Sequence, residues 1–269
     1  MKTLRLILGD QLNIKHSWYS TVSDSNVYCM FEMRQETDYV KHHIQKIVGF
    51  FAAMRNFSEQ LESMGHKVVY LTLDDSNNKQ NLEDNLKNIL VSHEIESFEY
   101  QSPDEFRLDT QLKSICNKLS ISFREFDSEH FYTKRNELSQ FYEGKKQFIM
   151  ERFYRYMRKK HHILMSGEHP EGGEWNYDKS NRNKWKGAPK VPPFLDFKNP
   201  VSNILKTINK SGIQTIGRFD FTTFSYPINR EQSLQQLDYF NQNLLIHFGD
   251  YQDALHTNEV YLFHSRLSF

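Results

Sequence analysis

The sequence predicts an α/β fold: a doubly wound, parallel, five-stranded sheet of the Rossmann-like kind, followed by a connector and the start of an all-α domain. Short apolar runs alternate with amphipathic stretches through the first 130 residues, a pattern typical of strands joined by helical crossovers. The runs are rich in β-branched and aromatic residues and have strand length. Beyond residue 130 the sequence instead contains long aromatic and basic stretches, which indicates a different kind of domain.

Each element of the α/β part follows from its own local pattern. Strands are predicted at residues 4–8, 27–31, 68–73, 98–100 and 121–126. Apolar residues recur at three- and four-residue steps from Val40 to Met64, which predicts one long helix ended by Gly65. Two more helices are predicted at residues 81–91 and 104–119, the second after the cap candidate Ser102.

The second half is expected to hold two helices and a long connector. Residues 138–165 predict one helix, and residues 231–248 predict another. Five of the seven prolines lie in residues 168–200, which is too long for an ordinary loop. We therefore expect an α/β domain at residues 1–130, a helix and connector at 131–215, and a helical segment at 216–269.

Composition excludes several classes of protein. Lys plus Arg and Asp plus Glu are both 34, so no overall positive field attracts nucleic acid or a membrane. No apolar run approaches the ~20 residues of a membrane span. Two cysteines, Cys29 and Cys116, are too few for a disulfide framework or a four-thiolate cluster. A cytoplasmic setting without membrane contact is expected.

Polar residues follow the first two predicted strands, where a doubly wound sheet opens its ligand crevice. Asp10 and Gln11 follow the first strand, and Glu36, Tyr39 and His43 follow the second. Their acceptors and donors suit a polar heterocycle or a ribityl chain better than a phosphate, since no glycine-rich phosphate loop is present. The alternative is local: Asp10 as a turn residue, and Thr37 or Asp38 as a helix cap.

The remaining histidine, acidic and basic residues form no pattern that predicts a metal site or a catalytic group. His42 and His43, like His161 and His162, are adjacent and lack ligand spacing, so no metal site is predicted. No GxSxG motif or paired acid and base suggests a catalytic group. Basic and aromatic residues at 152–160 suit nucleic acid, but an amphipathic helix with a buried aromatic face is the favoured interpretation.

Seven segments, taken in order, resemble the photolyase-related branch of the cryptochrome/photolyase superfamily, the bacterial (6-4) photolyases that carry an iron-sulfur cluster. They are LILGDQL at residues 6–12, ETDYVKHHIQKI at 36–47, AAMRNF at 52–57, MERFYRYMRKKHHILMSGEHPEGGEWNYDKSNR at 150–182, GRFDFTTF at 217–224, FGDYQDAL at 248–255 and LFHSRLS at 262–268. The resemblance covers the whole chain, and the long block at 150–182 makes it specific.

The resemblance implies an N-terminal antenna domain for 6,7-dimethyl-8-ribityllumazine, with Asp10, Gln11, Glu36, Tyr39 and His43 around the chromophore. It also implies that residues 262–269 resemble a flavin-contacting segment, so that His264, Ser265, Leu267 and Ser268 would meet the phosphate side of FAD. The rest of the FAD bowl, the lesion-protonating histidine, the electron-transfer aromatics and the four cluster cysteines are missing. FAD and the cluster are therefore expected only in an intact member of the family.

The resemblance predicts the N-terminal portion of a photolyase, a DNA lyase that repairs ultraviolet lesions by electron transfer from reduced FAD. DNA is the partner of the intact protein, and the chain alone is expected to bind it weakly or not at all and to lack catalysis. The alternatives are a stand-alone nucleotide- or flavin-like binding module and a light-signalling, cryptochrome-like protein. Self-association is expected through apolar residues beyond Gly217, namely Phe219, Phe221, Phe224, Leu237, Phe240 and Leu244.

Overall fold

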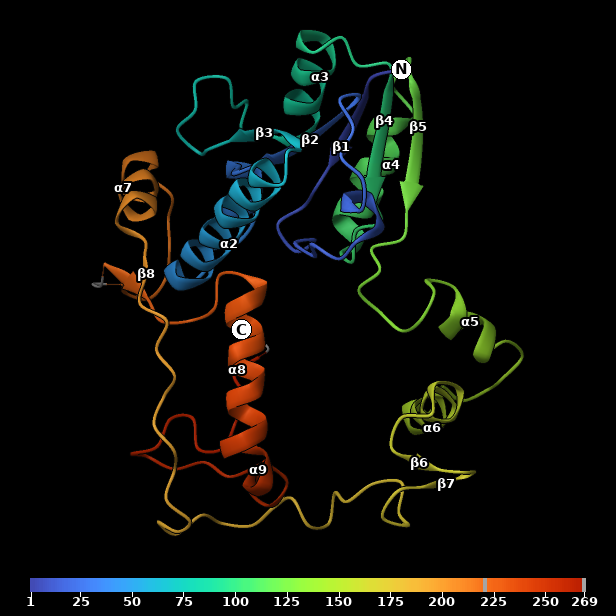
Figure 1. Cartoon of the computed structure of the whole chain (residues 1–269), viewed down its shortest axis with the longest axis vertical. Coiled ribbons are helices and arrows are strands. Elements are labelled where there is room, and N and C mark those ends of the chain that lie inside the picture. The colour runs from blue at the N-terminus through green and yellow to red at the C-terminus, as the bar shows by residue number, and fades with distance from the viewer. Residues whose placement is uncertain (220–221, 268–269) are drawn as a thin grey trace. The chain divides into compact units, whose positions relative to one another are not determined.

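The chain forms two compact units, which are described separately (Figure 1). The computed structural model describes residues 1–219 and 222–267. One unit, here called the sheet unit, contains residues 1–130 and 195–235. The other, the helical unit, contains residues 131–194 and the residues from 236 onward. The three-part division predicted from the sequence remains a prediction.

The sheet unit is built on five parallel strands, as predicted. They are β1 (Thr3–Leu6), β2 (Asn26–Phe31), β3 (Lys67–Leu71), β4 (Ser97–Gln101) and β5 (Ser122–Phe126), in the order β3-β2-β1-β4-β5. The chain adds strands outward on one side of β1 and then crosses to the other side, so the order reverses between β1 and β4. In doubly wound sheets this reversal opens a crevice at the carboxyl ends of the strands.

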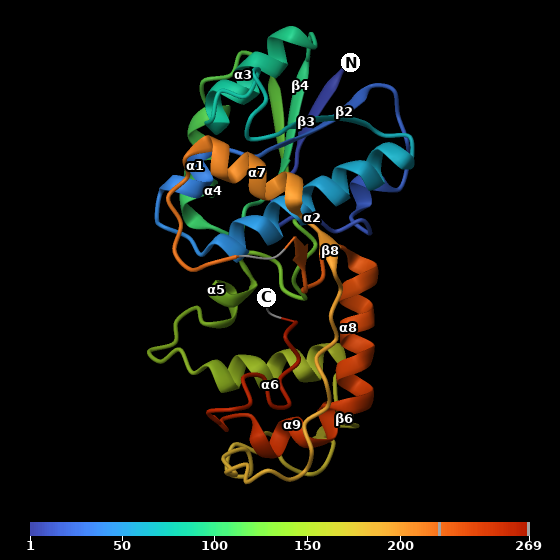
Figure 2. The ribbon, with the colours of Figure 1, turned by 90° about the vertical axis from the view of Figure 1, so that its left-hand side faces the viewer.

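Helices cover both faces of the sheet, which confirms the doubly wound arrangement. Leu4 and Leu6 face α3 (Leu82–Ser92) and α4 (Phe106–Cys116), whereas Tyr28 and Met30 belong to the core beneath α2 (Ile44–Ser63). Figure 2 shows α2 crossing the sheet. Successive residues of β2 thus enter opposite cores, which is why this strand is an almost unbroken apolar run rather than an alternating one.

The long helix predicted from Val40 starts later than predicted. A short helix, α1 (Arg34–Asp38), comes first, and a turn separates it from α2. The residue that caps α2 is His43, whose Nδ1 accepts a hydrogen bond from the backbone N–H of Gln45 at 3.2 Å. Thr37 and Asp38, the cap candidates, lie inside α1.

A helix that the sequence pattern did not predict, α7 (Ser202–Ser211), completes the sheet unit. Its Ile204 and Ile208, 5% and 2% exposed, share a core with Ile47, Val48 and Phe51 of α2. Flanking it, β8 (Asn199–Pro200) and β9 (Thr223–Phe224) pair in antiparallel fashion. The segment after the connector therefore packs on the same core as α2.

The helical unit corrects two predicted helices. Residues 138–165 do not form one helix but α5 (Glu137–Phe141) and α6 (Met150–His161), because Gly144 (φ +69°) turns the chain and His162 ends α6 in the left-handed conformation. A short hairpin of β6 (Met165–Ser166) and β7 (His169–Pro170) follows, and residues 171–198 have no helix or strand.

The predicted helix at 231–248 is likewise divided. Its two parts are α8 (Arg230–Asn243) and α9 (Leu245–Tyr251). Leu244 separates them and is the N-cap residue of α9. In α6, Phe153 and Arg158 are buried while Arg152, Lys159 and Lys160 face solvent. Of the helices described, none has the length and apolar character needed to cross a bilayer.

Candidate functional site

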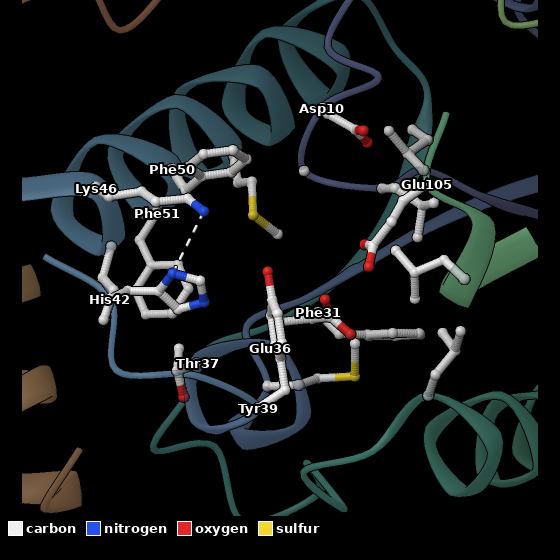
Figure 3. Close-up of a pocket in the computed structure, with 18 of the residues that line it drawn as sticks. Asp10, Phe31, Glu36, Thr37, Tyr39, His42, Lys46, Phe50, Phe51 and Glu105 are labelled. Carbon is white, nitrogen blue, oxygen red and sulfur yellow. Dashed lines mark hydrogen bonds between the residues drawn. The ribbon is translucent and has the colours of Figure 1, made fainter. Parts of the chain in front are cut away.

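A pocket opens in the sheet unit at the carboxyl ends of β1 and β2. Its volume is about 200 Å³. Apolar side chains from both strands, from the loops that follow them and from three helices form its floor and walls: Leu6, Ile7, Leu8, Phe31, Met33, Ile47, Phe50, Phe51, Met54, Leu82 and Leu108. Polar side chains surround them: Asp10, Glu36, Thr37, Tyr39, His42, Lys46 and Glu105 (Figure 3). An apolar pocket with a few convergent polar groups is the usual form of a small-molecule site.

Gly9 gives the loop after β1 its close approach to α2. A Cβ at this position would lie 3.1 Å from the Sδ of Met54 and 3.2 Å from a ring carbon of Phe50, closer than ordinary contacts between carbon atoms. Both neighbours line the pocket. The absence of a side chain at residue 9 therefore helps to shape the pocket wall.

One side of the pocket is acidic and is ordered by an arginine. Arg107 donates to both carboxylate oxygens of Glu36, at 3.1 and 2.6 Å, and also to Glu105, at 2.8 and 3.0 Å. Its guanidinium lies 4.5 Å from the ring centre of Tyr39. A bidentate arginine fixes the plane of a carboxylate, so Glu36 is held in place while 31% of its side chain stays exposed.

Asp10 stands near Glu105 at the pocket (Figure 3). Its side chain is exposed to solvent, yet the protein atoms gathered around it at the strand ends remove part of its hydration. This partial desolvation raises the pKa of Asp10, and the charge of Asp104 adds to the increase. Its own backbone N–H and His130 oppose the shift. Asp10 thus offers an acceptor that protonates more readily than an ordinary aspartate.

The other side of the pocket carries the sole lysine among its lining residues. The Nζ of Lys46 lies 3.3 Å from the Nδ1 of His42, and Figure 3 shows the pair across the pocket from Asp10 and Glu105. Desolvation and the Lys46 charge lower the pKa of His42, so its imidazole is neutral at pH 7 and its Nδ1 can accept a hydrogen bond from the ammonium group. The pocket therefore presents donors at one side and acceptors at the other.

The structure brings three of the five predicted residues together. Asp10, Glu36 and Tyr39 line the pocket. Gln11 is buried behind it: its Oε1 accepts from the N–H of Leu8 at 3.0 Å, and its Nε2 donates to the carbonyl of Gln101 at 3.2 Å. Gln11 thus orders the loop that carries Asp10.

His43 also lies outside the pocket lining, because it caps α2 and packs against Gly217. The neighbouring His42 takes the position that was predicted for His43. Other lining residues were not predicted, among them Lys46, Phe50 and Glu105. Lys46 follows His42 by four residues, a helical spacing, and this is the one signal in the sequence for the pair.

The predicted flavin segment lies in the helical unit. His264 borders a hollow of about 360 Å³, together with Ala254, Leu255, His256, Thr257, Glu259, Val260 and Leu262. The carbonyl of Ser265 accepts from the Nε2 of Gln236 at 2.9 Å, and Leu267 is 41% exposed. Ser268 falls outside the described residues. The hollow falls in the size range of small-molecule pockets.

The two thiols lie in the core of the sheet unit. Cys29 and Cys116 are 0% and 1% exposed. Desolvation raises the pKa of both, that of Cys116 to about 11, so both are protonated at pH 7. Across residues 1–219 and 222–267, no group of three or more His, Cys, Asp or Glu side chains is placed to hold a metal ion.

Known proteins resemble this chain over most of its length. The family described as "Deoxyribodipyrimidine photo-lyase-related protein" matches residues 5–224. A (6-4) photolyase of Agrobacterium fabrum is 31% identical over 279 aligned residues, which cover 100% of this chain and 53% of that protein. An uncharacterised protein of Acanthamoeba polyphaga mimivirus is 27% identical over 194 residues, 68% of this chain and 94% of the viral protein. This chain spans about half the length of the curated photolyase, and by the extent of the family match it belongs to the deoxyribodipyrimidine photo-lyase-related protein family.

Proposed function

We propose that the sheet unit binds an antenna chromophore, 6,7-dimethyl-8-ribityllumazine, in the pocket at the ends of β1 and β2. The chain would then be the N-terminal portion of a (6-4) photolyase-like flavoprotein. The observation that carries the proposal is the pocket itself: an aromatic floor ringed by donors and acceptors, at the sheet's switch point, in a chain of the photolyase-related family. When bound, the chromophore absorbs light and passes the excitation to a flavin.

The residues present fit such a ligand. The apolar floor, with Phe50 still 42% exposed, suits a flat heteroaromatic ring, since aromatic surfaces gain from stacking. Lys46 offers N–H donors to ring carbonyl oxygens, while the carboxylates of Asp10, Glu36 and Glu105 accept from ribityl hydroxyls. A volume of about 200 Å³ is below the ~300 Å³ at which drug-sized pockets begin. It therefore favours enclosing the ring and leaving the ribityl chain at the mouth.

Glu36→Gln is expected to weaken lumazine binding about three- to tenfold, because a charged acceptor is replaced by a weaker one. The sheet should stay folded, since Arg107 retains Glu105 as a partner. The measurement is a titration of wild type and variant with 6,7-dimethyl-8-ribityllumazine, with circular dichroism as the check on folding. Equal affinities in the two proteins would remove Glu36 from the site.

Repair is proposed only for a longer protein. There, reduced FAD would donate an electron to an ultraviolet lesion that has been flipped out of the DNA duplex. For the chain alone we propose no catalysis and weak or no binding to DNA. FAD and an iron-sulfur cluster likewise belong to the proposal for the longer protein. A reducing cytoplasm is the proposed location, given two buried free thiols.

A second candidate function is a stand-alone binding module that uses the same pocket. It is favoured by the viral relative, 94% of which aligns with part of this chain. That protein is therefore little longer than the region it shares with this chain. Both candidates require a ligand in the pocket and differ in whether a flavin domain receives the excitation.

Self-association is proposed for the chain alone, through surfaces other than those predicted. Phe224, Phe240 and Leu244 are buried, at 1%, 9% and 2% exposure, so these three predictions are wrong. Leu237 is 36% exposed and Phe219 is intermediate, whereas Phe221 lies outside the described residues. Other apolar side chains are more exposed: Leu234, Leu245, Ile246, Leu255 and Val260.

Sedimentation velocity of the purified chain should show concentration-dependent association, because exposed apolar surface favours burial between copies. The double change Ile246→Ser and Leu255→Ser is expected to shift the population toward monomer, since these side chains are 79% and 96% exposed. A wild type that stays monomeric at high concentration would refute the proposal.

A further inference from the structure

The turn that carries His42 into the pocket is held by a segment more than 170 residues later in the chain. The backbone N–H of Ile216 donates to the carbonyl of His42 at 3.0 Å, and the N–H of Ile44 donates to the carbonyl of Ile216 at 3.0 Å. Together they form an isolated parallel bridge between His43 and Ile216. A guanidinium nitrogen of Arg34, in α1, also donates to the carbonyl of Ser211 at 2.6 Å. Residues 211–216 therefore contact both α1, which carries Glu36 and Thr37, and the turn that carries His42.

Gly217 allows this contact to be close. Its backbone is in the left-handed region, at φ +75°, and a Cβ there would overlap the imidazole ring of His43. His43 cannot turn away freely, because its Nδ1 caps α2 by accepting from Gln45. Loss of such a cap costs helix stability. A side chain at residue 217 must therefore displace either the cap or the bridge.

We propose that Ile216 and Gly217 form a clasp that positions His42, and with it Lys46, for ligand binding, so that Gly217 is a positioning residue of the pocket. The inference rests on the proposed function and deepens it. The clasp fixes the backbone at residues 42–44 directly. The side chain of His42 points from that backbone into the pocket, beside Lys46. Movement of the turn therefore changes the positions of the polar groups of His42 and Lys46 in the pocket.

Gly212 provides a matched control for backbone strain. It also has positive φ, at +70°, and ends α7, but a Cβ there would meet nothing within 4 Å. Alanine at either position incurs the cost of a left-handed conformation. Only alanine at residue 217 meets His43. A difference between the two variants therefore reports the clasp and not the strain.

The test is a titration of the full chain with 6,7-dimethyl-8-ribityllumazine for wild type, Gly217→Ala and Gly212→Ala, and for His43→Ser alone and combined with Gly217→Ala. Serine keeps a capping oxygen and removes the ring that alanine would strike. Gly217→Ala should weaken binding about tenfold, the equivalent of one well-placed hydrogen bond. Gly212→Ala and His43→Ser should bind like wild type, and the double variant should regain most of the affinity.

A second readout needs no ligand. The imidazole signals of His42 and the methyl signals of Ile47, both of which line the pocket, are recorded by NMR for the same proteins. Gly217→Ala should shift them and the double variant should restore them, whereas Gly212→Ala should leave them in place.

The two readouts separate failure of the clasp from failure of the proposed function. If wild type does not bind lumazine, the proposed function fails and the NMR shifts alone decide the clasp. Unchanged pocket signals in Gly217→Ala would overturn the clasp. Wild-type affinity of Gly217→Ala, or no recovery in the double variant, would overturn it as well.

Discussion

Glu32→Ala is expected to lower the free energy of unfolding by about 3–5 kcal/mol, because it breaks a buried ion pair and leaves its partners unsatisfied. The Glu32 side chain is 0% exposed. Its carboxylate accepts from Arg55 at 2.6 and 2.9 Å, from the hydroxyl of Tyr70 at 2.8 Å and from the N–H of Leu73 at 2.9 Å. This cluster ties the ends of β2 and β3 to α2, and Glu32 and Arg55 are next in the chain to Phe31, Met33 and Met54 of the pocket lining.

Urea denaturation followed by circular dichroism measures the loss. Asp24→Ala is the matched control, because Asp24 pairs with Lys67 at 2.8 Å but is 98% exposed. That pair should contribute little, since water screens it. Equal losses in the two variants, or none in Glu32→Ala, would mean that the buried cluster does not stabilise the sheet unit.

Ile208→Ala is expected to cost about 2–5 kcal/mol, because a buried aliphatic side chain is cut back and leaves a cavity. Ile208 of α7 is 2% exposed and packs in the same core as Ile47 and Val48. The result would show that α7 stabilises the α/β fold, although it lies far beyond β5 in the sequence.

Val91→Ala is its control, with an aliphatic side chain on α3 that is 81% exposed. Surface changes of this kind usually stay within about 0.5 kcal/mol of wild type. The measurement is again the free energy of unfolding from urea titration. A loss in Ile208→Ala no larger than that in Val91→Ala would contradict the packing of α7 on α2.

The fold was predictable where local pattern and tertiary role coincide. The inner strands β1, β2 and β4 are largely buried, and their apolar residues mark them in the sequence. The edge strands β3 and β5 are more exposed, and short runs of β-branched or aromatic residues predict them instead. The helix α7 was missed because it begins directly after a proline-rich stretch and has few apolar positions of its own. The single helix predicted across residues 138–165 failed because aromatic residues continue through the turn at Gly144.

The location of the site could be predicted from the sequence, but only some of the residues that line it could. Asp10 lies in the loop after β1, and Glu36 and Tyr39 lie in and just after the short helix that follows β2, so the sheet topology brings them together. The choice between His42 and His43 depends on where α2 begins, a boundary of one or two residues that pattern does not resolve. Glu105 and Phe50 come from other elements, and their place in the pocket depends on packing between segments far apart in sequence.

The most direct test of the account is an equilibrium titration of the 269-residue chain with 6,7-dimethyl-8-ribityllumazine, followed by its visible absorption. Wild type should bind one molecule saturably. Phe50→Ala should bind about tenfold more weakly, because it removes an aromatic surface from the pocket. Phe123→Ala, on the edge strand β5 and 47% exposed against 42% for Phe50, should bind like wild type. Failure of wild type to saturate, or equal binding by wild type and Phe50→Ala, would contradict the assignment of this pocket to an antenna chromophore.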